Sequence, residues 1–595
     1  MPPKNPLPEL NKQLWRRVNS VREWHQLPLP LALLNLRAYR DELRELNLYD
    51  TREGANGSTP PAEAPKYRTY DGSYTDPNDP EMGAVESRFG RNVPPAVTKP
   101  EDGPSFMTPN PREVSRTLFT RDEFKPATSL NVLAAAWIQF QNHDWFGHGE
   151  NSPTEHFDLD LADDDEWGED VMRVRKTSPD RTARNGDGPP TFQNQATHWW
   201  DLSQVYGSTE ERNRELRTGE DGKLKLTDDG FLPDETSPGL QGIDLTGFND
   251  NYWIGLSLLH TLFVKEHNAI CDMLKRSYPS WDDEKLFLTA RLINSALSAK
   301  IHTIEWTPGI LANPVLQRGM HTNWYGLLPK WSKKVLGHRS LGEELTGIVG
   351  SPLEYHAAPF SITEEFVSVY RMHPLIPDEY DIRDHRSGSR IDVLDFMPIQ
   401  GKGTRETVSK YGFESLFYSF GTAHPGAITL HNHPKALQNF TRLSGERIDL
   451  GTIDILRDRE RGVLRYNDFR AQLRKPRIER FEDLTPNPIW NQEIREVYDG
   501  DIDRVDLQVG MLGEPVPPGF GFSDTAFRIF ILMASRRLKS DRFFTNDYTP
   551  EVYTPEGLEW IEKTNMSELI LRHHPELAPA LEGVQNAFAP WKKLG

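Results

Sequence analysis

A tyrosine and a histidine, Tyr370 and His373, stand three residues apart in the run Ser-Val-Tyr-Arg-Met-His-Pro-Leu. On a helix, residues i and i+3 lie on one face about a turn apart, so the phenol and the imidazole would project into the same space. If His373 ligates a haem iron, the Tyr370 phenol lies at the porphyrin edge, where an oxidised haem takes its electron. A core helix in which Tyr370 and His373 merely pack is the alternative, and the sequence upstream distinguishes the two.

The upstream feature is an i, i+4 pair, Gln139 and His143, in the run Trp-Ile-Gln-Phe-Gln-Asn-His-Asp. Both side chains can face the same side of a haem. His143 would be the distal base that moves a proton across a bound peroxide, since histidine suits general acid–base chemistry near neutral pH.

A candidate calcium loop accompanies this pair. The run Thr-His-Trp-Trp-Asp-Leu-Ser at 197–203 alternates oxygen groups, and Ca²⁺ takes carboxylate, hydroxyl and carbonyl oxygens. The proposed shell consists of the side chains of Asp144, Thr197, Asp201 and Ser203 and the carbonyl of Trp199. Alone, such a run is usually a turn or a helix cap. An aspartate directly beside the candidate distal histidine favours calcium.

These motifs together resemble those of the animal-type haem peroxidase superfamily, also called the peroxidase–cyclooxygenase superfamily. They occur in the family order over roughly residues 100 to 545 and include His-Thr-Leu-Phe-Val-Lys-Glu-His-Asn at 260–268. The resemblance implies a mainly α, cyclooxygenase-like haem peroxidase fold with long loops and few short strands. It also implies that His373 is the proximal haem ligand and His143 the distal histidine.

Departures from the family pattern point to an oxygenase. Peroxidases of the family carry an arginine eleven residues before the His-Thr-Leu motif and a haem-esterified carboxylate three residues later, where this chain has Asn249 and Tyr252. A second ester carboxylate precedes the distal histidine, and Asn142 stands there. The resemblance therefore implies haem b bound without ester links and poor peroxide turnover. Tyr370 occupies the position of the radical tyrosine of cyclooxygenases and related fatty-acid dioxygenases.

Two further segments are similar to those of plant-type fatty-acid α-dioxygenases. Ile-His-Thr-Ile-Glu-Trp-Thr, which begins at residue 301, resembles their Ile-His-Thr-Ile-Asp-Trp-Thr, and the run from Ala534 to Asn546 resembles their C-terminal signature. The resemblance implies that His302, Thr307 and Arg537, with Arg536 as the less favoured arginine, hold the substrate carboxylate. A buried acid does need a fixed cation and donors.

The resemblance thus implies a haem-dependent α-dioxygenase that inserts O₂ at C2 of a long-chain fatty acid through a tyrosyl radical, giving a 2-hydroperoxy fatty acid. Tyr370, His143 and Gln139 would be its catalytic residues. A haem peroxidase that oxidises small donors with H₂O₂, a silent haem- or lipid-binding protein and a mid-chain oxygenase are the alternatives.

The histidines at 424, 431 and 433 permit a metal interpretation. The family resemblance implies a different role for this stretch, because an asparagine after the proximal helix accepts the proton of the haem-ligating histidine and orients it. Asn432 is the candidate for that role.

Charge and cysteine content constrain the partners. The formal net charge is −19, with 88 acidic and 69 basic residues, which disfavours nucleic acid as a partner. Cys271 is the only cysteine, so disulfides within the chain are excluded and a reducing compartment is expected. We find no signal-peptide pattern and no apolar run that approaches a membrane span. The protein is therefore expected to be intracellular and not secreted, either cytoplasmic or peripheral to a membrane, and a monomer is favoured.

The chain divides by its local patterns into an N-terminal part, 1–110, and a catalytic domain, 111–595. The amphipathic stretch 12–47 predicts helices that either dock on the domain or contact a membrane surface. The Pro-, Gly-, Asp- and Asn-dense stretch 51–112 predicts an extended arm that wraps the surface. Apolar spacing predicts helices at 127–146, 251–276, 283–306, 361–374, 429–443 and 523–540.

Overall fold

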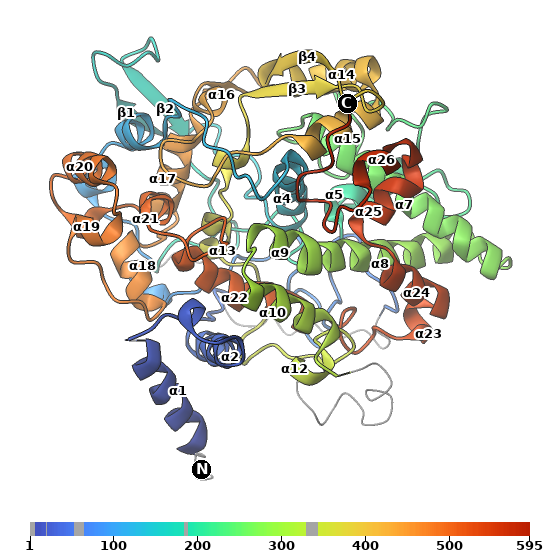
Figure 1. Ribbon diagram of the computed structural model, residues 1–595, viewed down its shortest axis with the longest axis horizontal. Coiled ribbons are helices and arrows are strands. Elements are labelled where there is room, and N and C mark those ends of the chain that lie inside the picture. Colours follow the sequence, from blue (N-terminus) through green and yellow to red (C-terminus); the bar gives the residue numbers. More distant parts are fainter. Residues whose placement is uncertain (1–5, 20, 53–64, 184–187, 329–342) are drawn as a thin grey trace.

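The computed structural model describes residues 6–19, 21–52, 65–183, 188–328 and 343–595. Helices make up most of the regular structure in these ranges, and long irregular connections join them (Figure 1). The predicted mainly α fold with long loops is confirmed.

The regular structure in the first half of the chain is almost entirely helical. It begins with α1 (Pro6–Asn19), η1 (Trp24–Gln26), α2 (Leu29–Leu46), η2 (Pro95–Val97), η3 (Gly103–Met107), α3 (Pro111–Val114) and η4 (Ser115–Phe119). It continues with α4 (Val132–Trp145), β1 (His156–Asp160), β2 (Val171–Arg175), α5 (Ser203–Tyr206), α6 (Glu210–Leu216), α7 (Ile254–Ser277), α8 (Asp283–Ile301), η5 (His302–Trp306), α9 (Thr307–Ile310), α10 (Pro314–Tyr325) and α12 (Glu343–Thr346).

The second half begins with α13 (Glu364–Val369), η6 (His373–Leu375), β3 (Glu379–Arg383), β4 (Arg390–Asp395), η7 (Met397–Ile399), α14 (Gly403–Tyr411), α15 (Phe413–Thr422), α16 (Lys435–Gln438), β5 (Phe440–Thr441) and β6 (Arg447–Ile448). It continues with α17 (Leu450–Glu460), α18 (Tyr466–Gln472), α19 (Phe481–Leu484), α20 (Pro488–Val497), η8 (Ile502–Arg504), α21 (Leu507–Gly513), α22 (Asp524–Lys539), α23 (Pro550–Tyr553), α24 (Pro555–Lys563), α25 (Met566–His573), η9 (Pro575–Leu577) and α26 (Ala578–Leu581).

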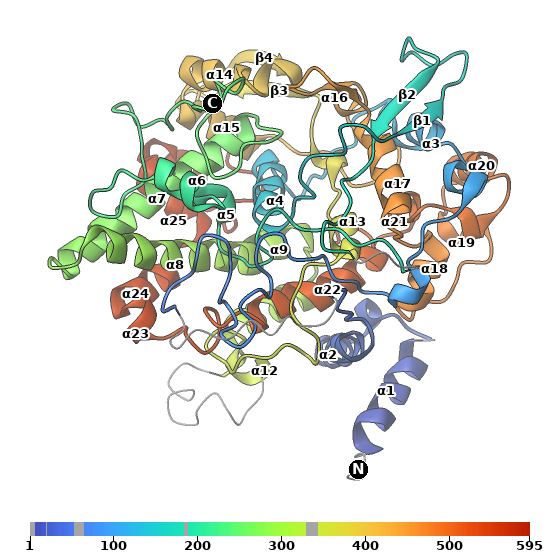
Figure 2. The same ribbon diagram turned by 180° about the vertical axis from the view of Figure 1, so that it is seen from behind.

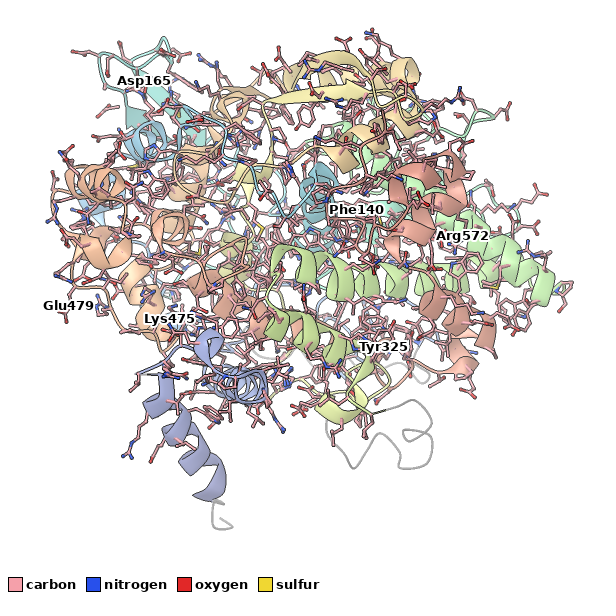
Figure 3. The ribbon with its side chains drawn as sticks, in the orientation of Figure 1. Phe140, Asp165, Tyr325, Lys475, Glu479 and Arg572 are labelled. Carbon is pink, nitrogen blue, oxygen red and sulfur yellow. The ribbon has the colours of Figure 1, made fainter. Side chains whose placement is uncertain are left out.

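Helix α4 lies at the centre of the molecule, and its residue Phe140 marks the middle of the side-chain view (Figure 3). The sequence Val-Leu-Ala-Ala-Ala-Trp-Ile-Gln-Phe gives this helix apolar side chains on all faces, which suits a helix surrounded by others. It packs on α5, α7 and α15. The Asn131 side chain caps its first turn by accepting the Ala134 N–H at 3.3 Å.

Strands contribute little to the described part of the chain. They form three antiparallel pairs, β1–β2, β3–β4 and β5–β6. The pair β1–β2 stands at the periphery (Figure 2). The expectation of few short strands is confirmed, and the candidate site is built from helices and their ends.

The N-terminal elements are attached to the body unevenly. Helix α1 projects away from it, whereas α2 lies against α10 and α22 (Figures 1 and 2). Trp24 of η1 is fully buried, donates its indole N–H to Asp524 Oδ1 at 3.0 Å, and contacts the rings of Phe520 and Phe527. This stretch therefore docks on its own domain. No helix in the described ranges is both long enough and apolar enough to span a membrane.

The arm at 65–110 is extended, but its burial differs from the predicted surface position. Arg68 forms a buried ion pair with Asp541 at 2.7 Å, and Arg91 forms another with Glu365 at 2.8 Å. Phe89 belongs to the main hydrophobic core. The density of proline and glycine accounts for the lack of α-helix in the arm, where the regular structure is limited to the 3₁₀ turns η2 and η3, but it does not reveal these long-range contacts.

Most of the predicted helices are present with small shifts at their ends, as α4, α7, α8 and α22. The helix predicted at 361–374 is shorter, because α13 ends at Val369. The helix predicted at 429–443 is wrong. Of that stretch only α16 is helical, His431 has a left-handed backbone with φ of 52°, and Pro434 interrupts the pattern.

Candidate active site

Helix α4 carries Gln139 and His143, the two predicted distal residues. The Gln139 side chain accepts the indole N–H of Trp253 at 2.7 Å and donates to the carbonyl of Asn251 at 3.2 Å. His143 Nδ1 is buried and has no hydrogen-bond partner among the described residues. Burial lowers the pKa of His143 to about 4, so its ring is neutral at pH 7 and able to accept a proton.

Tyr370 and His373 do not share one helical face as predicted. Tyr370 is the C-cap of α13, and His373 starts the separate 3₁₀ turn η6. The Tyr370 ring is nonetheless buried, stacks on Phe530 at 4.4 Å and meets the edge of Trp145 at 5.3 Å. Burial raises its pKa, so the phenol stays protonated. Asn142 of α4 donates to the Tyr370 carbonyl at 3.4 Å, which ties this segment to the distal helix.

His373 is oriented by Asp454, not by Asn432. Its Nδ1 lies 2.6 Å from Asp454 Oδ2. Because a carboxylate accepts, the proton is on Nδ1 and Nε2 is left as the free ligand atom. Asn432 instead accepts from Arg121 at 3.0 Å and from the Lys125 N–H at 3.0 Å, so the prediction of its contact with His373 was wrong.

Asp454 was missed because it lies on α17, 81 residues after His373, in a run without a recognisable motif. His433, whose ring centre lies 5.6 Å from that of His373, completes a group of three possible metal-binding side chains. This group lies at the candidate haem ligand itself. It gives no reason for a separate metal site.

Arg537 on α22 is a buried cation without an acidic partner. Only 2% of its surface is exposed, and it makes no ion pair or hydrogen bond to any described residue. Its guanidinium lies 3.6 Å from the ring centre of Trp145 and 4.1 Å from that of Trp200. Burial lowers its pKa to about 10, so the charge persists at neutral pH. An unpaired buried cation beside aromatic rings is a fitting receptor for an acid.

His302 faces the same two tryptophan rings. Its ring centre lies 5.2 Å from that of Trp145 and 5.1 Å from that of Trp200, and it stacks on Trp306 at 4.7 Å. Burial and the nearby charge of Arg537 hold the pKa of His302 well below its ordinary value. His302 is therefore neutral. Trp145 thus touches His302, Arg537 and Tyr370 at once.

Thr307 follows His302 through the π-helical turn η5 and is buried. In a π turn the hydrogen bonds run from residue i to i+5, so side chains five apart lie much closer to one face than in an α-helix. Pro308 explains the turn locally, because a proline lacks the N–H of a regular helix and clashes with the carbonyl four residues before it. The local sequence therefore favours Thr307 on the His302 side.

Arg536, the less favoured arginine, contacts backbone carbonyls of the 355–360 segment and not the tryptophan rings that Arg537 contacts. Its guanidinium donates to the carbonyls of Ala358 at 2.7 Å and Pro359 at 2.8 Å and lies over the Phe360 ring. These contacts fasten the 355–360 segment to α22. The structure thus separates the tandem pair, with only Arg537 beside Tyr370.

Four of the five predicted calcium ligands, Asp144, Thr197, Asp201 and Ser203, contact one another. Asp144 Oδ1 accepts the N–H and the hydroxyl of Ser203 at 2.6 and 3.0 Å. Asp201 Oδ1 accepts from Thr197 Oγ1 at 3.0 Å and from the Ser203 N–H at 3.2 Å, and its Oδ2 pairs with Arg291 at 3.1 Å. Two carboxylates therefore share one backbone N–H.

Electrostatics in this loop fit a cation. Asp144 Oδ2 is buried without a hydrogen-bond partner in the described ranges. Burial and the neighbouring Asp201 carboxylate raise the pKa of Asp144 well above its ordinary range. The Trp199 side chain, which is also buried, stacks on Phe360. A divalent cation would relieve the repulsion between the carboxylates, and the donors are all oxygens.

No arginine stands at the two positions counted from the His-Thr-Leu motif. Asn249 donates to Glu235 at 2.7 Å, and the Tyr252 hydroxyl donates to Asp244 at 3.1 Å. Both side chains are therefore hydrogen-bonded to buried carboxylates. Neither position supplies an acid for a haem ester, and nor does Asn142.

A family comparison decides what kind of protein carries these residues. The animal haem peroxidase model matches residues 67–588, nearly the whole chain. The chain belongs to the animal haem peroxidase family. This confirms the resemblance and the haem peroxidase fold inferred from the sequence.

Within this family, the chain is most informatively compared with α-dioxygenases. It is 40% identical over 586 residues to rice alpha-dioxygenase PIOX, covering 96% of this chain and 93% of that protein. It matches the crystal structure of a tyrosine-to-phenylalanine variant of rice fatty acid alpha-dioxygenase with palmitic acid, with a TM-score of 0.91 and 37% identity over 98% of this chain and 97% of the other. It also matches the crystal structure of the fatty acid alpha-dioxygenase of Arabidopsis thaliana, with a TM-score of 0.90 and 36% identity over 99% of this chain and 93% of the other.

Proposed function

We propose that this member of the animal haem peroxidase family is a fatty-acid α-dioxygenase that inserts O₂ at C2 of a long-chain fatty acid and gives a 2-hydroperoxy fatty acid. The observation that carries this proposal is the unpaired, buried Arg537 on the same tryptophan ring as Tyr370. The names of the similar plant proteins and the palmitic acid in the rice structure support it.

The residues fit a haem b bound without ester links. His373, with Nδ1 held by Asp454, would offer Nε2 to the iron, and Gln139 and His143 would be the distal residues. Bound haem supplies the oxidant that takes an electron from a phenol. His143, neutral at pH 7, would accept the proton of the activating peroxide at a ring nitrogen.

Tyr370 would then work as a radical in a closed cycle. Its oxyl radical takes a hydrogen atom from C2 and becomes the phenol again. O₂ adds to the C2 radical, and the resulting peroxyl radical takes the hydrogen atom back from the phenol. The hydroperoxide is released and the tyrosyl radical is restored, so the fatty acid and O₂ are the only reagents consumed.

The carboxylate group of the substrate would be held by Arg537, His302 and Thr307. Arg537 Nε and Nη1 have no hydrogen-bond partner among the described residues, and His302 uses Nδ1 for its hydrogen bond with Trp137, so its Nε2 is the nitrogen left for an acid. A carboxylate accepts two or more charge-assisted bonds at about 2.7–2.9 Å from such donors. Anchoring the head group beside Tyr370 presents the adjacent carbon to the phenol.

We also propose a structural Ca²⁺ ion held by Asp144, Asp201, Thr197, Ser203 and the Trp199 carbonyl. The support is the pair of buried carboxylates with one unpartnered oxygen. Because Asp144 directly follows His143 on α4, the ion would fix the last turn of the distal helix.

Contact with a membrane surface through the N-terminal helices is proposed as well, in an intracellular setting that the single cysteine supports. Exposed apolar side chains gather there: Leu14, Val21, Leu29, Leu31 and Leu34. Basic residues at positions 12, 16, 17 and 22 accompany them in a strongly acidic chain. Flotation with anionic vesicles tests this. The double variant L31E/L34E should float less than the Ile489→Glu control, which alters an exposed isoleucine elsewhere.

O₂ uptake by haem-loaded protein with palmitate and no added H₂O₂, followed by mass spectrometry, tests the main proposal. Uptake with a 2-hydroperoxy acid, or the aldehyde one carbon shorter, is the expected result. Guaiacol oxidation with H₂O₂ and no uptake with palmitate would instead make the protein a peroxidase.

A further inference from the structure

The π turn η5 is held from outside by the C-terminal segment of the chain. Glu305, in the middle of the turn, has a buried side chain, and both of its carboxylate oxygens lie 3.2 Å from the backbone N–H of Met566, the first residue of α25. Asn586 donates its side-chain N–H to the Glu305 carbonyl at 2.8 Å. One segment thus binds both the side chain and the backbone of a single residue of η5.

Lys300, at the end of α8, strengthens this attachment. Its ammonium donates to the carbonyls of Ile561 at 2.7 Å and Glu562 at 2.9 Å in the last turn of α24, and of Thr564 at 3.0 Å in the connection to α25. The helix before the π turn and the turn itself are therefore both fixed to residues 561–566. Helix α25 lies beside α7 and shows its Arg572 at the surface of the body (Figure 3).

The same segment reaches His302 from a second direction, through Trp137 of α4. The Phe588 ring lies 5.3 Å from that of Trp137, and Asn131 donates to the carbonyls of Ala587 and Ala589 at 2.7 and 2.8 Å. Trp137 in turn places its indole N–H 3.1 Å from His302 Nδ1.

This last contact sets the protonation pattern of His302. An indole nitrogen can only donate, so His302 Nδ1 must carry the lone pair. The neutral ring then has its proton on Nε2. With the opposite tautomer, Nε2 would carry a lone pair and would repel a carboxylate.

We infer that the C-terminal segment Met566–Ala589 is a positioning element of the acid-binding site, acting through Glu305 on the π turn and through Trp137 on His302. The inference rests on the proposed function, because it takes a carboxylate as the ligand. A π turn is less stable than a regular helix and relies on outside contacts. Without the contacts from Met566 and Asn586 to Glu305, η5 can relax toward α-helical geometry, which rotates Thr307 away from the His302 face.

The consequence is specific to head-group binding. Glu305 and Trp137 are positioning residues. Loss of either should weaken the binding of fatty acids without slowing the hydrogen transfer at Tyr370, because the Tyr370 ring contacts neither of them. The effect should be the same for acids of 12, 14 and 16 carbons, since they share the head group.

The test compares the haem-loaded variants Glu305→Ala and Trp137→Phe with wild type by O₂ uptake and by calorimetric binding of palmitate. We expect KM and Kd to rise about tenfold, the equivalent of one buried hydrogen bond, with kcat within about twofold. Glu305→Gln, which keeps an oxygen for the Met566 N–H, should restore most of the affinity lost in Glu305→Ala.

Trp560→Phe is the matched control. It removes the hydrogen bond from the Trp560 indole to Glu266 at 2.7 Å and so loosens α24, the helix that leads into this segment, while keeping all of the contacts to η5 described above. Unchanged KM and Kd in both test variants would overturn the inference, as would an equal rise in the control. If wild type takes up no O₂ with palmitate, the proposed function fails first; if wild type is active and the variants bind normally, only the positioning role fails.

Discussion

Replacing Arg537 by methionine should leave the ligand-free protein nearly as stable as wild type while removing its affinity for fatty acids. Burial lowers the pKa of Arg537 to about 10, roughly two and a half pH units below its usual value, which corresponds to a charge-burial cost of about 3 kcal/mol. Contacts with the Trp145 and Trp200 rings offset this by roughly 1–2 kcal/mol each. The two effects nearly cancel, so we expect the free energy of unfolding to change by no more than about 1 kcal/mol.

Arg68→Met is the matched control for this experiment. Arg68 is as deeply buried as Arg537 and also lies over aromatic rings, those of Phe543 and Phe544. It differs in having an acid partner, Asp541, at 2.7 Å. Removing one member of a buried pair leaves an uncompensated charge and costs about 3–5 kcal/mol. Urea denaturation of the ligand-free proteins should therefore separate the two variants by at least about 2 kcal/mol.

Palmitate provides the second half of the assay. At a ligand concentration of about 100 Kd, wild type should gain about 2.7 kcal/mol of stability. Loss of a buried charged partner weakens binding by about 2 kcal/mol or more, so the gain in Arg537→Met should fall below about 1 kcal/mol. A destabilisation equal to that of Arg68→Met would show that Arg537 is structural. An undiminished gain with palmitate would place the acid-binding group elsewhere.

Three further outcomes are expected. Tyr370→Phe should abolish O₂ uptake while changing the unfolding midpoint little, because the hydroxyl makes no hydrogen bond to a described residue; uptake at the wild-type rate would refute the radical role. Burial raises the pKa of Glu305 to about 7, with Lys300 opposing and Glu568 adding to the rise, so the unfolded state loses this proton first and stability should fall by about 3 kcal/mol from pH 4.5 to 7. Glu305→Gln should lack this part of the fall. If the denaturation midpoint of Glu305→Gln differs from that of wild type by the same amount at pH 5 and at pH 8, the assignment is contradicted. Asp144→Asn should be more stable than wild type in a chelator, because it removes the repulsion with Asp201, yet should gain nothing from added Ca²⁺; an equal calcium-dependent rise in melting temperature in both proteins would exclude the site.

The residues that the sequence identified best are those with short-range patterns. The position of Gln139 and His143 on one helix could be predicted because a regular helix shows its period in the sequence, and the apolar composition of α4 also marks it as central. Helices α7, α8 and α22 were found for the same reason. Pro308 is a local signal that a regular helix is disturbed near Thr307. That the disturbance is a π turn is seen only in the structure.

Contacts between distant segments were the ones that sequence reasoning missed. Asp454 replaces Asn432 as the partner of His373, and no local signal connects residues 81 positions apart. The burial of the arm through Arg68 and Arg91 depends on acids 473 and 274 positions away. The end of α13 before Tyr370 is a further case, since a helical spacing alone does not reveal where the last turn unwinds.

If the proposed function holds, selectivity for C2 would follow from the single indole ring that Arg537 and Tyr370 share. The Arg537 guanidinium lies 3.6 Å and the Tyr370 ring centre 5.3 Å from the centre of the Trp145 ring, so the two groups cannot be more than about 9 Å apart. A carboxylate bound to Arg537 at about 2.7–2.9 Å occupies much of that separation. The carbon next to the head group would then lie near the phenol, whereas a mid-chain carbon would call for an acid-binding group much farther from Tyr370. The Trp145 ring follows His143 and Asp144 directly on α4, so one helical turn would couple the proposed distal base, the candidate calcium ligand and the choice of carbon.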